Sequence, residues 1–221
     1  MDGRFPDVKG AREAGLRVVH LPLGYDGIEP ERLRSFKRLI AEEEGPIFVH
    51  CHRGIHRGPA AAAILWMLRG HGSPEQAREI LVQAGTSPRY QRLWEAVENF
   101  IPPVGDCSEA PLPARVEVDG LAAVMIEIDR ARSNLGRHVQ SQPDIAPEHE
   151  ALILVEHLRE MERLDPGGHA ARDKDFRSQL IASRRAAEAL AARTDVGQEA
   201  WQRALEKLDA TCTACHLSHR N

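Results

Sequence analysis

The sequence predicts two domains, an α/β domain followed by an all-α antiparallel four-helix bundle. Two short apolar runs rich in β-branched residues, 16–23 and 46–51, predict buried strands in the first half of the chain. The segment 101–114 contains four prolines and few apolar residues, which is typical of a linker. Beyond it the strand pattern ends, and four helical stretches with short breaks follow.

The elements of the first half follow in order from the same patterns. A helix is predicted over 30–45, with a proline near its start and a glycine at its end. It lies between the two predicted strands, an order that indicates a parallel pair at the centre of an α/β domain. Three more helices are predicted at about 58–69, 74–84 and 89–100.

The second half is predicted to be entirely helical. Short connections between its helices favour antiparallel packing of neighbours. We therefore place an α/β domain at 1–103, a linker at 104–114 and a four-helix bundle at 115–221. The predicted helices of the bundle are 116–138, 147–164, 170–193 and 197–219.

Composition excludes several classes of function. With 42% hydrophobic and 28% charged residues the chain is typical of a globular protein, and no apolar run approaches the roughly 20 residues of a membrane span. A formal net charge of −4 argues against a nucleic-acid binder, because such domains are usually basic. The four cysteines are too unevenly spaced for a disulfide framework.

The last predicted helix carries a haem-attachment pattern, Cys212-Thr-Ala-Cys215-His216. In C-x-x-C-H two thiols form thioether bonds to the haem vinyl groups, and the histidine binds the iron. The pattern predicts one covalent haem c. Two alternatives stay open: a zinc site that uses His216 or His219, and a dithiol redox pair.

Because this motif ends the last of four helices, residues 115–221 resemble the cytochrome c prime family. Arg220, a basic residue four positions after His216, belongs to the resemblance. The resemblance implies a first-helix residue on the distal side of the haem, and Met125 matches that position as a candidate axial ligand. Met125 also lies among apolar residues, where a methionine is commonly a core filler. We expect a redox partner protein and a homodimer formed through the bundle.

A second motif, His50-Cys51-His52-Arg53-Gly54-Ile55-His56-Arg57, follows a predicted strand and opens an alanine-rich helix. A strand that turns into a helix presents backbone N–H groups and the positive end of the helix dipole, which can bind a phosphate and stabilise a thiolate. Arg57 can then grip two phosphate oxygens. The basic residues His52, Arg53 and His56 suit a dianionic or polyphosphorylated substrate, including a small molecule.

This motif resembles the signature H-C-x-x-G-x-x-R of the cysteine-dependent protein tyrosine and dual-specificity phosphatases. The resemblance implies that Cys51 is the nucleophile, that Arg57 binds the phosphoryl oxygens and that an upstream aspartate is the general acid. Asp26, 25 residues before Cys51, is the matching acid, and Glu29 is a weaker substitute. The expected substrate-binding residues are His50, His52, Arg53, Gly54, Ile55, His56 and Gly58.

The sequence departs from the phosphatase pattern in two ways. Gly58 replaces the hydroxyl residue that assists hydrolysis of the phosphoenzyme, which predicts slow turnover. The first strand and helix of a phosphatase sheet are missing ahead of residue 16. Two alternatives stay open: Cys51 as a buried thiol at a strand end, and Asp26 as a cap of the turn before Pro30.

Together the motifs predict a phosphomonoesterase with a cysteinyl-phosphate intermediate, fused to a c-type haem domain for electron transfer or for gas or redox sensing. The alternative is a haem electron-transfer or sensor protein whose phosphatase-like domain only binds an anion. The haem resemblance implies a bacterial periplasmic location. Since the N-terminus shows no secretory signal, we expect the native protein to extend upstream.

Overall fold

The computed structural model divides into two compact units, residues 1–118 and 119–221. Each unit has its own buried apolar core. The structure describes residues 6–116, 121–139, 147–163, 174–193 and 197–219.

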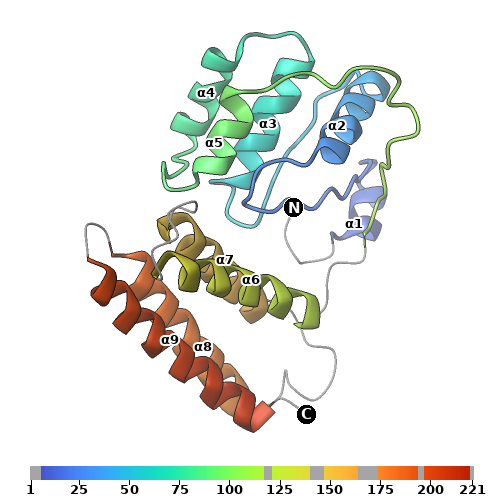
Figure 1. Ribbon diagram of the computed structural model, residues 1–221. Coiled ribbons are helices and arrows are strands. Elements are labelled where there is room, and N and C mark those ends of the chain that lie inside the picture. The colour runs from blue at the N-terminus through green and yellow to red at the C-terminus, as the bar shows by residue number, and fades with distance from the viewer. Residues whose placement is uncertain (1–5, 117–120, 140–146, 164–173, 194–196, 220–221) are drawn as a thin grey trace. The chain divides into compact units, whose positions relative to one another are not determined.

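The first unit is built around α3. This helix contacts α2, α4 and α5, and Figure 1 shows these helices gathered around it. Its sequence, RGPAAAAILWML, is apolar on all sides, which is typical of a helix that other elements surround. The helices of this unit are α1 (Val8–Glu13), α2 (Pro30–Glu42), α3 (Arg57–Leu68), α4 (Pro74–Gln83) and α5 (Gln91–Glu98).

The core of this unit combines one or two large side chains from each of the helices α2, α3, α4 and α5. Those with almost no exposed surface are Phe36, Ile64, Leu81, Leu93 and Val97. Helix α2 begins with a proline at its first position and Glu31 in its first turn, both favourable at a helix N-terminus. Helix α4 begins with a capping box made by Ser73 and Gln76.

The prediction of an α/β domain is wrong: all regular secondary structure in the described part of the chain is helical. The backbone N–H of His20, in the first predicted strand, donates to Pro113 O at 2.7 Å, and the Val116 N–H donates to His20 Nδ1 at 3.1 Å. The segment 16–23 thus takes its partner from the proline-rich stretch. A sheet would instead require main-chain pairing along the length of two such runs.

The second predicted strand, 46–51, keeps a strand-like alternation without belonging to a sheet. Ile47, Val49 and Cys51 are more buried than the residues between them, and Phe48 is 88% exposed. The prediction of a buried strand is therefore wrong here, because alternate residues of the segment are exposed and no partner strand exists among the described residues.

The proline-rich stretch predicted as a linker belongs to the first unit. Lys37 Nζ donates to Pro103 O at 2.9 Å and to Gly105 O at 3.1 Å. Arg38 Nη1 donates to Ala110 O at 2.7 Å. Two basic side chains of α2 therefore hold this segment, and the boundary between the units falls after it, at 118/119.

The second unit is a bundle of α6 (Leu121–Val139), α7 (Pro147–Arg163), α8 (Lys174–Ala191) and α9 (Gln198–His219). Each helix packs on the next along the chain, and α6 also packs on α9, which closes the bundle. Each helix contributes a fully buried leucine to the core: Leu135, Leu154, Leu190 and Leu208. Where the chain is described, no helix combines the length and the hydrophobicity needed to cross a bilayer.

Candidate functional sites

The loop after Cys51 brings the thiol against the first turn of α3. Residues 51–56 have no regular secondary structure, and Gly54 has a φ of 71°, a left-handed conformation that costs other residues free energy. A Cβ atom on Gly58 would lie 3.1 Å from the backbone nitrogen of Cys51 and 3.4 Å from its Sγ. The absence of a side chain at Gly58 therefore lets the buried Sγ lie beside the positive end of the helix.

Arg57, the first residue of α3, is buried below this loop. Its Nη1 donates to Leu23 O at 3.1 Å. Its Cζ lies 4.5 Å from the centroid of the Tyr25 ring, a cation–π distance. The chain between Leu23 and Tyr25 thus holds the guanidinium group in place.

The floor of the loop is aromatic. The rings of Tyr25 and Tyr90 stack with centroids 5.2 Å apart, and those of Tyr90 and His56 lie 4.0 Å apart. Thr86 Oγ1 donates to Ile55 O at 2.5 Å. Sequence reasoning missed Tyr25, Tyr90 and Thr86. One signal was present: the chain has only two tyrosines, and one of them precedes the candidate acid.

The outer side of the loop is basic and exposed. His52 and Arg53 are exposed, and so is His50, whose ring stacks on Phe48 with centroids 5.6 Å apart. The structure therefore separates the basic residues of the motif into two groups. Arg57 and His56 pack below the loop, while the others face outward.

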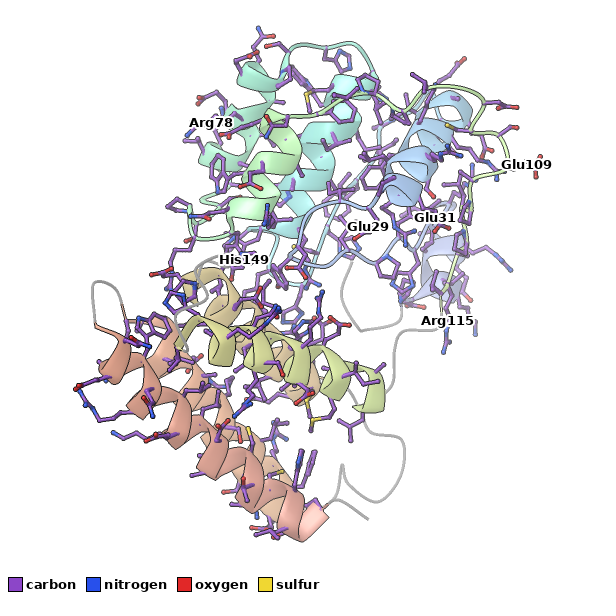
Figure 2. The ribbon with its side chains drawn as sticks, in the orientation of Figure 1. Glu29, Glu31, Arg78, Glu109, Arg115 and His149 are labelled. Atoms are coloured by element: carbon purple, nitrogen blue, oxygen red, sulfur yellow. The ribbon has the colours of Figure 1, made fainter. Side chains whose placement is uncertain are left out.

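Asp26 directly follows Tyr25, and its side chain is exposed. The N-cap position of α2 belongs to Glu29, which makes no side-chain capping hydrogen bond. Figure 2 labels Glu29 and Glu31 at the start of this helix. Asp26 is therefore not the N-cap residue of α2.

The thiols of the C-x-x-C-H motif lie one turn apart on α9. Cys215 is buried, Cys212 is half-buried and His216 is exposed. Burial raises the pKa of both thiols; the carboxylate of Asp209 raises the pKa of Cys212 further, and that of Asp175 the pKa of Cys215. Both are free thiols in the structure. The direction is opposite to that in dithiol redox enzymes, where the thiol pKa is lowered.

The register of α6 on α9 relates Met125 to this motif. Arg132 Nε donates to Asp209 Oδ1 at 2.9 Å, and Arg132 Nη2 donates to Asp209 Oδ2 at 2.6 Å. The helices run antiparallel. Met125 precedes Arg132 by seven residues and His216 follows Asp209 by seven, so equal rises along the helices bring both to one level of the bundle. Met125 is half-buried, and Arg220 lies outside the described residues.

Helix α8 presents an acceptor at the same level. His219 Nε2 lies 3.2 Å from Asp175 Oδ2, to which Gln179 Nε2 also donates at 2.7 Å. The buried Oε1 of Gln179 has no hydrogen-bond partner among the described residues. The spacing of Cys212 and Cys215 one turn apart, directly before His216, fits covalent attachment of a haem at this end of α9.

No protein family, curated protein or solved structure matches this chain. Within the described ranges, no group of three or more His, Cys, Asp and Glu side chains is arranged to hold a metal ion.

Proposed function

We propose that this protein is a periplasmic c-type haem protein that also hydrolyses phosphomonoesters through Cys51. The observation that carries the haem proposal is a C-x-x-C-H motif on the last helix of a bundle, with Cys215 buried and Cys212 half-buried. The observation that carries the phosphatase proposal is a buried Cys51 against the first turn of α3, next to a buried Arg57.

In the bundle, Cys212 and Cys215 would hold the haem, His216 would bind its iron, and Met125 is the candidate for the other face. When bound, the group supplies one-electron transfer and a site for a small gas molecule. The place of the motif at the end of the last of four helices favours haem over the redox-pair and zinc alternatives.

In the first unit, the Cys51 thiolate would attack phosphorus while the bond from phosphorus to the leaving oxygen breaks. Asp26 would give its proton to that oxygen, and Arg57 would bind the phosphoryl oxygens. Water would then cleave the S–P bond and return a proton to Asp26, releasing inorganic phosphate. With Gly58 in place of a hydroxyl residue, this second step is the slower one.

A second candidate, anion binding without turnover, is favoured by Gly58 and by the existing contacts of Arg57. The Arg57 guanidinium group already bonds Leu23 O and lies over the Tyr25 ring. A loop built in this way can hold a phosphate without the second step. The two candidates predict opposite results with a phosphomonoester substrate.

The haem proposal is tested with protein produced together with haem-attachment machinery. We expect a haem band that survives denaturing electrophoresis, and its loss in a Cys212→Ser, Cys215→Ser double variant. Absence of the band in the wild type contradicts the proposal. Met125→Ala tests the sixth position: unchanged optical spectra in both oxidation states remove Met125 as a ligand.

The phosphatase proposal is tested with aryl and alkyl phosphates. Cys51→Ser should abolish turnover, and Cys107→Ser, which changes another buried thiol of the same unit, should leave it intact. Anion binding alone is indicated if phosphate protects Cys51 from alkylation while no substrate turns over.

The assignment of the acid is tested by leaving group. Loss of a general acid costs about a hundredfold to ten-thousandfold in rate, and poor leaving groups suffer most. We expect Asp26→Asn to slow an alkyl phosphate far more than an activated aryl phosphate. Glu29→Gln is the matched control, and equal loss on both substrates in Asp26→Asn transfers the role to Glu29.

A further inference from the structure

One short segment of the first unit carries three groups that the proposed phosphatase chemistry needs. Leu23 offers its carbonyl oxygen to Arg57 Nη1 at 3.1 Å, Tyr25 lies under the Arg57 guanidinium at 4.5 Å, and Asp26 follows next in the chain. Arg57, which would bind the phosphoryl oxygens, thus contacts the same segment that carries Asp26, which would donate the proton.

Tyr25 is held firmly from its other side. Its ring is 8% exposed and stacks on Tyr90, which is 4% exposed and contacts His56 of the loop in turn. Gly27, with a φ of 108°, then turns the chain beside Arg92 O, 3.7 Å from where a Cβ would lie. The Tyr25 ring therefore cannot shift without opening space between the loop and α5.

From these contacts we propose that Tyr25 is a positioning residue, which sets Arg57 and Asp26 in one geometry for phosphoryl transfer. The proposal rests on the proposed phosphatase activity of Cys51. Its physical basis is alignment: a displacement of about 1 Å in a reacting group can cost about a hundredfold in rate. The Tyr25 ring acts through its face, which Phe shares and an aliphatic side chain lacks.

The test compares three variants of the full-length protein. Tyr25→Leu removes the ring beside Arg57, Tyr25→Phe keeps it, and Phe36→Leu removes another buried ring of the same unit, on α2. Each is assayed with an activated aryl phosphate and an alkyl phosphate, and unfolding by urea is followed for each. Protection of Cys51 from alkylation by inorganic phosphate measures anion binding separately from turnover.

We expect Tyr25→Leu to lower turnover of the alkyl phosphate by about a hundredfold, to affect the aryl phosphate much less, and to weaken phosphate protection. Tyr25→Phe should keep the wild-type pattern on all three measurements. Phe36→Leu should also lose stability, while it keeps the wild-type ratio between the two substrates. If Tyr25→Leu does not fold, Tyr25→Met, which has a flexible side chain without a ring, takes its place.

Three results overturn the proposal. Equal loss on both substrates in Tyr25→Leu, together with unchanged phosphate protection of Cys51, shows a structural role alone, and loss of the wild-type pattern in Tyr25→Phe shows that the ring face is not what matters. A wild type that turns over neither substrate overturns the proposed activity itself, and the role of Tyr25 in it.

Discussion

At the scale of single residues, the Cys51 loop depends on side chains that lie far apart in the sequence. Arg57 contacts Tyr25, His56 contacts Tyr90, and Ile55 accepts from Thr86. Each of these contacts joins the base of the loop to another segment of the unit. The loop is therefore anchored at its base, while His52 and Arg53 are exposed on its outer side.

Gly54 provides a prediction at this scale. Its left-handed φ of 71° leads us to expect that Gly54→Ala lowers the free energy of unfolding of the first unit by about 1–2 kcal/mol. Open space surrounds the position of a Cβ, so the cost is conformational rather than steric. Gly54→Asn is the control, because asparagine tolerates this conformation better. Equal unfolding midpoints in urea for the two variants would speak against this explanation.

The thiols of Cys212 and Cys215 provide a second prediction, for the haem-free protein. Folding raises the pKa of both, chiefly through burial. The folded state thus holds these protons more tightly, and the associated stability is full below the ordinary thiol pKa of about 8.5 and is lost as the pH rises toward the folded value.

We therefore expect the urea midpoint of the haem-free bundle to fall as the pH is raised from about 7 to about 10, and the Cys212→Ser, Cys215→Ser double variant to show a flatter profile. The measurement is urea unfolding at a series of pH values. Parallel profiles for the two proteins contradict the assignment.

The sequence predicted candidate reactive residues but not the residues that pack against them. Cys51, Gly54 and Arg57 were candidates because the resemblance sets their spacing within one loop. Tyr25 and Tyr90 were not, because their contacts with Arg57 and His56 join segments far apart in the sequence, which no local pattern encodes. A residue whose function depends on what packs against it is visible only in the folded chain.

At the scale of elements, the antiparallel pairing of α6 with α9 is what relates Met125 to the haem motif. The bidentate pair between Arg132 and Asp209 fixes this register. Both side chains are more than a third exposed, so solvent screens their attraction, and the two-point geometry contributes mainly specificity.

A double-mutant cycle measures this pair. Arg132→Ala, Asp209→Ala and their combination should give a coupling free energy of about 0.5–1 kcal/mol at low salt, decreasing as salt is added. Arg203 and Glu199, 3.5 Å apart and highly exposed on α9, form the control pair, with coupling close to zero. Coupling of the same size in both pairs would mean that the register is not held by Arg132 and Asp209.

Helices were predictable from the sequence to within a few residues at most ends, whereas strands were not. The apolar period of α2 and α4, with a proline at the start of each, is a local signal. In the run 46–51, Ile47, Val49 and Cys51 are more buried than the residues between them, as in a strand. A strand also needs a neighbouring strand, and neighbours are set by the whole fold. Helix α1 was missed because it has only six residues and none of them is buried, so it shows no apolar period.

At the scale of the whole molecule, the two units each bury a core of their own, so each is expected to fold alone. Arg38 of α2 holds the proline-rich stretch at Ala110 and His20 holds it at Val116, so the first unit extends to about residue 116.

The fragment 119–221, produced with haem-attachment machinery, should therefore be helical by circular dichroism and carry covalent haem. A second fragment, 104–221, begins at the predicted linker and lacks α2, which holds the linker in the full-length chain. Its extra residues should therefore be unpacked, and it should be no more stable than the fragment 119–221. An unfolded 119–221 fragment alongside a folded full-length chain would contradict the independence of the units.

The hydrogen bonds of His20 with Pro113 and Val116 have a consequence for modular use of the first unit. They place His20, near the start of this unit, next to Pro113 and Val116, near its end. A domain with adjacent entry and exit points can be inserted into a surface loop of another protein without forcing the two halves of its host apart. Residues 16–116 could therefore be transplanted as a cassette that brings the Cys51 loop into a new host protein.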